Sequence, residues 1–360
     1  MKIAIVATHN WPIPHKTHTG EICILDLAIG LEQLGHDITM IAPAGTNFPK
    51  LIPMRCSYGQ YPPSSEECEG EVRHNHYEEL RSFDIIHDFS NSKVITRGAN
   101  FPANAIQTLL GGPWRQNTPP RNLVAWSQSH RNRVLCGETD YAGTSNPTIG
   151  GPRGEPVKDC RVVNGGIDTG FYCPDKYEKD DYYLWCNRWH PAKGYAAAIQ
   201  LAKDTGIRLI MAGEHPDNEL FQYQKSCAHD AIILAAGASN ITFEFLPADP
   251  DHHTAKRELY RRAKALLYTV EFQEPFGLSQ AEALACGTPV IGHRFGSVPE
   301  VVKDGETGIV ADCIGWTQLR AAEKIDPVFC RKNATQRFDR RVMAKNYLAL
   351  YEKIVNGGGW

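Results

Sequence analysis

Residues 274–290 read EPFGLSQAEALACGTPV, and this stretch decides how the whole chain is interpreted. Apolar runs flank it on both sides, and Pro275 and Gly277 mark a turn within it. We therefore predict a helix over Leu278–Cys286 between two strands. A strand, a loop, a helix and a second strand in this order are typical of a parallel sheet with helices on its faces.

The start of this predicted helix combines free backbone N–H groups with two nearby glutamates. The first N–H groups of a helix, here at about Phe276 to Leu278, lack intrahelical partners and attract anions. Glu274 lies just before that end and Glu282 about one turn inside it. Carboxylates beside an anion site accept protons from hydroxyl groups, as a sugar or a ribose would supply. The spacing of the two glutamates alone favours another interpretation, in which Glu274 is a surface loop residue and Glu282 is an exposed helix position.

The same alternation of strands and helices fills both halves of the chain. A strand at Lys2–Thr8, a loop, a helix at Glu21–Leu34 and a strand at Ile38–Ala42 form one unit. The pattern begins again after a segment rich in Pro and Gly, and 360 residues exceed what one core usually supports. The polar stretch Lys50–Glu79 is interpreted as a surface excursion. We predict an N-terminal domain at 1–163, a second domain at 164–332, and a C-terminal segment at 333–360 whose helix, Ala334–Val355, packs back on the N-terminal domain.

Composition excludes several classes of protein. The chain has 38 Lys and Arg against 41 Asp and Glu, so it lacks the basic excess of a nucleic-acid-binding protein. No apolar run reaches the length of a membrane span, and Met1-Lys2 leads directly into a strand rather than a secretory signal. The 11 cysteines are scattered without a CxxC pair, which is typical of reduced core residues. We expect a cytoplasmic protein.

Taken together, the motifs resemble family 4 of the retaining glycosyltransferases. The resemblance implies the GT-B fold, in which two doubly wound, Rossmann-like α/β domains face each other across a cleft and a C-terminal helix follows. It also implies retention of anomeric configuration without a protein nucleophile, because the leaving diphosphate helps to deprotonate the acceptor. Besides residues 274–290, it rests on Thr19-Gly20-Glu21, on residues 84–87, on Val163–Asp168 with Phe171, on Asn187-Arg188, on Lys193-Gly194, and on residues 296–308.

The resemblance implies a role for individual residues. Glu274 would hold the hydroxyls of the donor sugar and Glu282 the ribose, while Arg188 and Lys193 would neutralise the diphosphate. Fixed cations suit a leaving group whose negative charge grows in the transition state. The alternative is that Arg188 and Lys193 are ordinary solvated residues beside a turn. The remaining donor-binding candidates are backbone positions: Gly20, Phe276, Gly277 and Leu278.

Two departures from the family pattern concern the N-terminal half. Thr19-Gly20 stands where the family usually has Gly-Gly. The strand at 105–111 ends in Leu110-Gly111, where the family commonly has His before Gly, so an expected hexose contact is missing. The candidate sugar or acceptor contacts are therefore His87 and Thr108, with the loop histidines His9, His15 and His18 as further candidates.

No metal or cofactor is expected, and the nucleotide sugar is a co-substrate. Asp249-Pro250-Asp251 superficially matches a metal-binding DxD motif, but its proline and the helix expected after it favour a turn. UDP-glucose is the preferred donor and GDP-mannose the second; the acceptor, whether small molecule, glycan or lipid, is not identified. The alternatives are a sugar-nucleotide epimerase or phosphorylase of the same fold, or a non-catalytic nucleotide-binding module. An oxidoreductase is disfavoured, since residues 8–20 lack GxGxxG.

Overall fold

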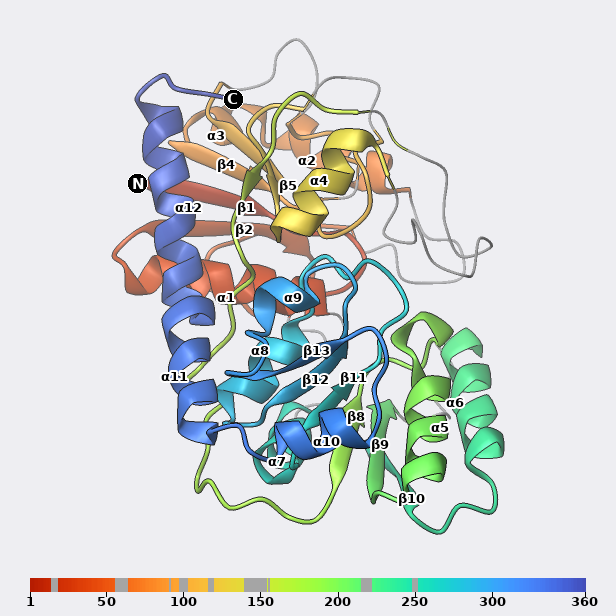
Figure 1. The fold of residues 1–360 in the computed structure, drawn as a ribbon. Coiled ribbons are helices and arrows are strands. Elements are labelled where there is room, and N and C mark those ends of the chain that lie inside the picture. Colours follow the sequence, from red (N-terminus) through yellow and green to blue (C-terminus); the bar gives the residue numbers. More distant parts are fainter. Residues whose placement is uncertain are drawn as a thin grey trace. The chain divides into compact units, whose positions relative to one another are not determined.

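A computed structural model shows the fold and describes all residues except 14–18, 56–63, 91, 97–102, 116–119, 139–153, 155, 215–221 and 248–251. The chain forms two compact units (Figure 1). Unit 1 contains the described residues of 1–138, 154–166 and 340–360, and unit 2 contains those of 167–339. The chain therefore enters unit 2 after Gly166 and returns to unit 1 after Asp339.

Unit 1 is built on a parallel sheet with the strand order β3-β2-β1-β4-β5-β6-β7. From β1 the chain adds strands towards one edge and then continues from β4 towards the other, so the order reverses between β1 and β4. The strands are β1 (Lys2–Val6), β2 (Asp37–Pro43), β3 (Leu51–Met54), β4 (Ile85–Asp88), β5 (Ala105–Thr108), β6 (Leu123–Ala125) and β7 (Arg161–Val162).

Helices cover both faces of this sheet. Alternate strand residues such as Val6 and Ile86 share a core with Cys68 and Val72 of α2 (Ser65–Asn75), which α3 (Tyr77–Arg81) follows. The opposite face carries α1 (Thr19–Gln33) and α12 (Arg340–Val355), which pack together, and α4 (Gln128–Cys136) lies beside β6. The predicted surface excursion at 50–79 is wrong, because it contains strand β3 and the buried face of α2.

Unit 2 has a second parallel sheet, with the order β10-β9-β8-β11-β12-β13 and a reversal between β8 and β11. Two parallel α/β units are thus confirmed. The strands are β8 (Tyr183–Cys186), β9 (Leu209–Glu214), β10 (Ile241–Leu246), β11 (Leu266–Tyr268), β12 (Val290–His293) and β13 (Gly308–Ala311).

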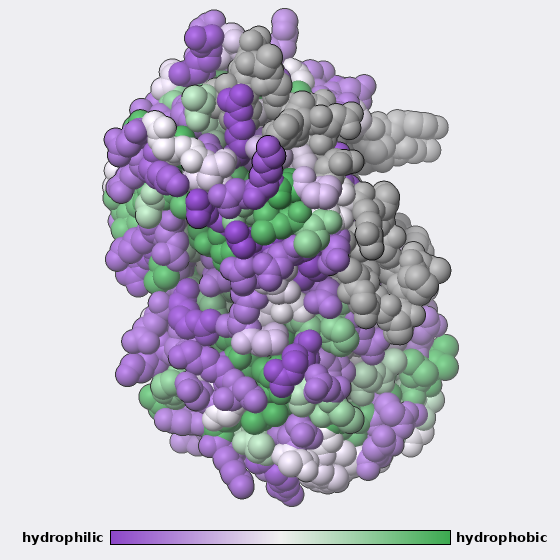
Figure 2. All heavy atoms as spheres, turned by 45° about the horizontal axis from the view of Figure 1, so that its top comes forward, coloured by the Kyte–Doolittle hydropathy of each residue, from purple (hydrophilic) through white to green (hydrophobic). Residues whose placement is uncertain are grey.

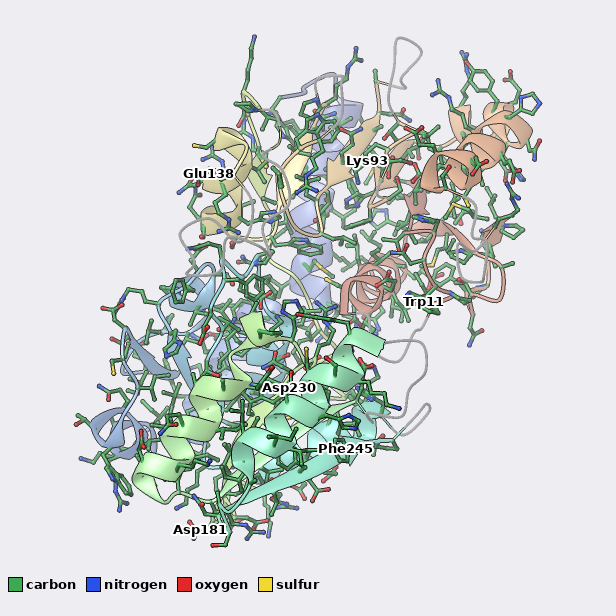
Figure 3. The ribbon with its side chains drawn as sticks, turned by 90° about the vertical axis from the view of Figure 1, so that its right-hand side faces the viewer. Trp11, Lys93, Glu138, Asp181, Asp230 and Phe245 are labelled. Carbon is green, nitrogen blue, oxygen red and sulfur yellow. The ribbon has the colours of Figure 1, made fainter. Side chains whose placement is uncertain are left out.

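The faces of the second sheet are also covered by helices. Figure 3 shows α5 (Tyr195–Thr205) and α6 (Gln222–Ala235) side by side over the face that carries Phe245 of β10. Trp185 and Trp189 lie in that core. The helices α7 (His252–Arg262) and α8 (Leu278–Ala285) contact the sheet, and α10 (Trp316–Ala322) contacts β12 and β13. The short elements are η1 (Pro191–Lys193) and α9 (Val298–Val301).

The C-terminal segment is two helices rather than the single one predicted over Ala334–Val355. Helix α11 (Pro327–Phe338) packs against α8 in unit 2, and α12 begins at Arg340 in unit 1. Between them Asp339 is extended, with φ −61° and ψ 141°, and its carboxylate accepts a hydrogen bond from Thr169. In unit 1, Arg340 lies 2.9 Å from Asp26 of α1. Because the helix ends at this point, the apolar residues before Asp339 are buried in unit 2 and those after it are buried in unit 1.

The surface is largely hydrophilic on the face that Figure 2 presents, where apolar residues gather in small separate patches. Within the described residues, no helix has both the length and the apolar character needed to span a membrane.

Candidate functional site

The candidate site of unit 2 lies where the strand order reverses. The strands β8 and β11 are neighbours there, although other strands separate them in the sequence. In open α/β sheets ligands bind beyond the carboxyl ends of the strands at such a point. The turn η1 follows β8 and carries Lys193, while the loop after β11 carries Glu274 and leads into α8. The topology thus brings together the two segments that the sequence singled out.

Lys193 and Glu274 form an ion pair. The Lys193 Nζ lies 2.6 Å from Glu274 Oε2, and the two side chains are only 13% and 10% exposed. The hydroxyl of Tyr268 donates to the same oxygen at 2.6 Å. Burial, and next the Glu274 carboxylate, raise the pKa of Tyr268 well above its usual range, so its proton stays in place. Oxygen Oε1 of Glu274 takes no hydrogen bond from any described residue and can accept one from a ligand.

The backbone around Gly194 fixes this ion pair. Gly194 has φ +71°, and a Cβ at this position would collide with the carbonyl oxygen of Thr269. The Thr269 hydroxyl donates to the Gly194 carbonyl at 2.7 Å, and the Glu271 N–H donates to the Ala192 carbonyl at 2.8 Å. The turn after β8 is therefore docked directly on the loop after β11, which carries Lys193 to Glu274.

Helix α8 begins with unpaired donors. Its N-cap is Gly277, at φ 78°, and no side chain caps it. The N–H groups of Gly277, Leu278 and Ser279 donate to no acceptor in the described part of the chain. Phe276 is different, because its ring packs against Phe338 and its carbonyl accepts from neighbouring side chains. A helix thus begins where it was predicted, with N–H groups that could contact an anion, and the side chain of Phe276 is buried beside it.

Glu282 is buried, so the interpretation as an exposed helix position is wrong. Its Oε2 lies 2.6 Å from the Nζ of Lys256 on α7, with side-chain exposures of 4% and 8%. The Tyr260 hydroxyl donates to the same oxygen at 3.3 Å. Burial alone would lower the pKa of Lys256, but the attraction of Glu282 outweighs it and raises that pKa, so the lysine stays charged. Lys256 was not predicted from the sequence, although its spacing places it between His252 and Tyr260 on the buried face of α7.

Arg188 lies exposed just after β8 and makes no hydrogen bond or ion pair with the residues described. Burial first, and then the charges of Arg188 and Lys193, lower the pKa of the intervening His190. A concentration of positive charge therefore follows β8. Asp249 and Asp251, the residues of the DxD-like motif, lie outside the described residues.

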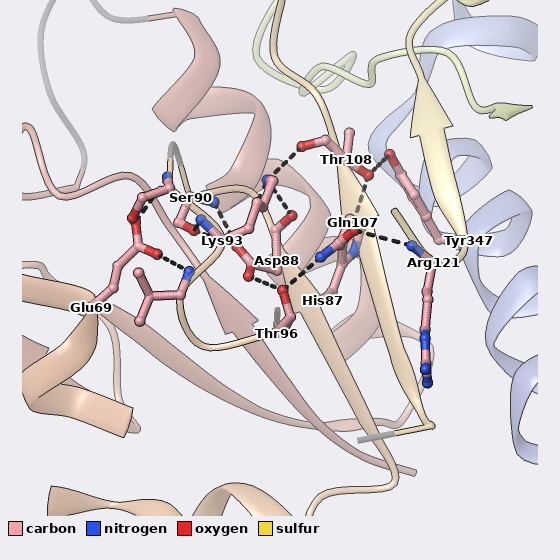
Figure 4. A network of polar contacts seen from close by, with 12 residues as sticks. Glu69, His87, Asp88, Ser90, Lys93, Thr96, Gln107, Thr108, Arg121 and Tyr347 are labelled. Atoms are coloured by element: carbon pink, nitrogen blue, oxygen red, sulfur yellow. Dashed lines mark hydrogen bonds and ion pairs between the residues drawn. The ribbon is translucent and has the colours of Figure 1, made fainter. Parts of the chain in front are cut away.

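The predicted contacts in unit 1 have different surroundings. His87 is fully buried, and its Nδ1 lies 2.6 Å from the Tyr351 hydroxyl. Its Nε2 lies 2.8 Å from the Thr108 hydroxyl (Figure 4). Thr108 Oγ1 also lies 3.1 Å from the Tyr347 hydroxyl. Strand alternation turns His87 towards α12, opposite to Ile86. Both ring nitrogens are used within the unit, so neither His87 nor the hydroxyl of Thr108 is available for a direct sugar contact.

Leu110, one of the two departures from the family pattern, lies against the glycine that follows Thr19. Gly20, near the start of α1, would place a Cβ 3.2 Å from Cδ1 of Leu110, which stands where the family commonly has His. Leu110 therefore fills the space beside this glycine. His9 is buried, whereas His15 and His18 lie outside the described residues.

Residues 173–342 match the family model described as glycosyl transferases group 1. This segment contains Lys193, Glu274 and Glu282. A D-inositol 3-phosphate glycosyltransferase of Segniliparus rotundus is 28% identical over 227 residues, which cover 55% of this chain and 47% of that protein. The protein of the same name from Mycobacterium bovis is 35% identical over 158 residues, covering 41% of this chain and 32% of that protein. The chain thus spans less than half the length of these relatives.

Solved structures extend the likeness to the whole chain. A glycosyltransferase involved in avilamycin A biosynthesis superimposes with a TM-score of 0.70 at 21% identity and covers 100% of this chain and 99% of its own. The Anabaena protein HepE, solved in complex with UDP and glucose, has a TM-score of 0.67 at 17% identity, with 98% and 100% covered. At this identity the likeness shows the fold, which is the GT-B fold expected from the sequence.

Proposed function

We propose that the chain is a glycosyltransferase that transfers a hexose from a nucleotide diphosphate sugar to a hydroxyl acceptor. The observation that carries this proposal is the Lys193–Glu274 pair at the strand-order reversal of unit 2, beside the unpaired N–H groups of α8. A cation, a carboxylate and a helix start at one place suit a ligand that combines phosphates with hydroxyls. The family match over the same residues supports it.

The proposed roles follow from the hydrogen-bonding capacity of each group. Tyr268 and Lys193 occupy Oε2 of Glu274, which leaves Oε1 to accept hydrogen bonds from the sugar hydroxyls. Lys193 and the exposed Arg188 then face the diphosphate, whose charge grows as the glycosidic bond breaks. Because Lys193 contacts Glu274, phosphate binding and sugar binding are coupled through one ion pair. Glu282, held by Lys256, contacts the ribose.

The finer features of the reaction follow family 4 of the retaining glycosyltransferases. The leaving diphosphate accepts the proton of the attacking hydroxyl on the same face of the sugar, so the anomeric configuration is retained. UDP-glucose is the preferred donor and GDP-mannose the second. Lys193 and Arg188 supply the positive charge, and no metal ion is required. Turnover that stops in EDTA and returns with manganese would contradict this last point.

Nucleotide binding tests the proposal. The melting temperature of the full chain is measured with UDP, GDP and ADP, because a ligand at about 100 times its Kd stabilises by about 2.7 kcal/mol. One nucleotide should shift the melting temperature more than the others, and Arg188→Ala should reduce that shift. The matched control is Arg294→Ala, an exposed arginine of unit 2 whose described partners are the exposed Asp312 and the carbonyl of Val310. Equal shifts with all three nucleotides, or none, would remove the support for a specific donor site.

A further inference from the structure

A pocket of about 270 Å³ lies in unit 1 beyond the carboxyl ends of β4 and β5. Phe89, Ser90 and Lys93 line it after β4, and the segment from Thr108 to Arg115 lines it after β5. Among the described residues, its lining includes two cations, Lys93 and Arg115, and no carboxylate. Of the two contacts predicted in unit 1, Thr108 is among its described lining residues and His87 is not.

The floor of the pocket includes Lys93, whose backbone lies in the left-handed region. Lys93 has φ +56°, which is unusual for a residue with a side chain. Its ammonium donates to the carbonyls of Asp88 at 2.8 Å and Thr108 at 3.0 Å, and its own N–H donates to Ser90 Oγ at 3.2 Å (Figure 4). Strained backbone persists only where its surroundings enforce it, and it is concentrated at functional sites.

A buried network holds this loop. Asp88 is fully buried and accepts from the Ser90 hydroxyl at 2.6 Å and from the Thr96 hydroxyl. Behind it, Glu69 of α2 accepts from the Val94 N–H at 2.8 Å (Figure 4). Burial lowers the pKa of Lys93, while the attraction of Asp88 and then Glu69 opposes that shift. The pocket floor is therefore preorganised before any ligand arrives.

The rim of the pocket offers donors without partners. Arg115 is exposed and makes no hydrogen bond or ion pair with the residues described. The N–H groups of Leu110 and Gly111 likewise donate to no described acceptor. Leu110, in the place of the histidine that the family pattern predicts, adds an apolar wall. Unpaired N–H groups and a guanidinium together suit a carboxylate or phosphate.

We propose that this pocket binds the acceptor through an anionic group, a phosphate or a carboxylate, that the acceptor carries beside its reactive hydroxyl. Arg115 and the N–H groups of Leu110 and Gly111 contact the anion, and Lys93 supplies positive charge from below. The identification of the ligand as the acceptor rests on the proposed function. The prediction that the pocket binds an anion does not depend on it. The volume suits a group of monosaccharide size rather than a larger ligand.

Binding of charged and neutral sugars tests the proposal on the full chain. Kd values are measured for glucose 6-phosphate, glucuronate and glucose, with UDP, GDP and ADP titrated separately in the same preparation. We expect at least one anionic sugar to bind at least about tenfold more tightly than glucose. Arg115→Gln should weaken that binding about 10- to 100-fold without changing UDP binding. The control Arg81→Gln alters an exposed arginine of α3 and should leave both affinities unchanged.

Each outcome decides a separate point. Equal affinity for all three sugars, or anion binding that survives Arg115→Gln, would overturn the pocket assignment. Anion binding by a chain that binds none of UDP, GDP and ADP would support the pocket and contradict the proposed transferase. Phosphatidylcholine vesicles containing phosphatidic acid distinguish a lipid phosphate from a soluble one. Vesicle binding that Arg115→Gln abolishes supports the pocket with a lipid source, and vesicle binding that this change leaves intact contradicts it.

Discussion

Replacing Lys193 with Met removes the cation that contacts Glu274 and leaves the carboxylate with Tyr268 as its remaining partner. Breaking a fully buried ion pair costs about 3–5 kcal/mol, and breaking an exposed one costs about 0–1 kcal/mol. The two side chains are 13% and 10% exposed, and Tyr268 still donates to the oxygen that loses the lysine. We therefore expect a loss of about 2 kcal/mol, or about 4–8 °C in the melting temperature of unit 2.

The same change should also lower the turnover of the protein that remains folded. Loss of one preorganised electrostatic contact typically reduces kcat about 10²- to 10³-fold, and the diphosphate gains charge only as the bond breaks. The assay measures nucleoside diphosphate release by folded protein, alongside thermal unfolding. The double variant Lys193→Met with Glu274→Gln should regain part of the lost stability, because no unpaired carboxylate remains, yet it should stay inactive.

The matched control is Lys303→Met. Lys303 pairs with Glu306 at 3.8 Å, and their side chains are 47% and 57% exposed, so its loss should change stability by no more than about 0.5 kcal/mol. A Lys193→Met variant that unfolded at lower temperature but kept its specific activity would contradict a role of Lys193 in turnover. Lys193 would then merely hold the turn after β8 against the loop after β11.

Three further predictions concern single groups. Glu274→Gln should keep the fold but lose most turnover, since an amide nitrogen cannot accept from a sugar hydroxyl; near-normal kcat contradicts the role. Burial lowers the pKa of Lys179 to about 8 in the folded chain, from 10.5. Between these two pH values the unfolded chain binds more protons than the folded one, so the free energy of unfolding rises with pH. Urea unfolding at about pH 7–10 should show a component of up to about 1.4 kcal/mol per pH unit that Lys179→Met removes. Burial, and then Lys93, lower the pKa of His87 well below its usual range, so stability falls as the pH drops below about 6.5. His87→Gln should flatten that acid limb, and an unchanged slope would mean that other groups cause it.

Several strands follow from local sequence because their apolar runs are short and buried. The strands predicted at Lys2–Thr8 and Ile38–Ala42 form β1 and β2, and the bounds of each lie within a residue or two of the prediction. Strand β3 was missed because Pro53 and polar flanks conceal it. The strand lies at the edge of the sheet, where a residue without an N–H is tolerated.

The helix boundary at Asp339 was beyond the sequence for another reason. The apolar spacing of residues 334–355 is continuous, so it predicts one helix. The two halves of that stretch pack against different partners, α8 for one and α1 for the other. A periodic pattern shows that a face is buried but carries no information about which surface covers it.

The sequence by itself determined two α/β units, a helix start beside Glu274, and cations after β8, because periodicity, turn residues and charge are local properties. Only the tertiary structure joined Lys193 to Glu274, placed Lys256 against Glu282, and buried His87 between β5 and α12. Each of these contacts links segments far apart in the chain. Their meeting depends on strand order and on the face to which each side chain turns, and both are decided when the sheets assemble.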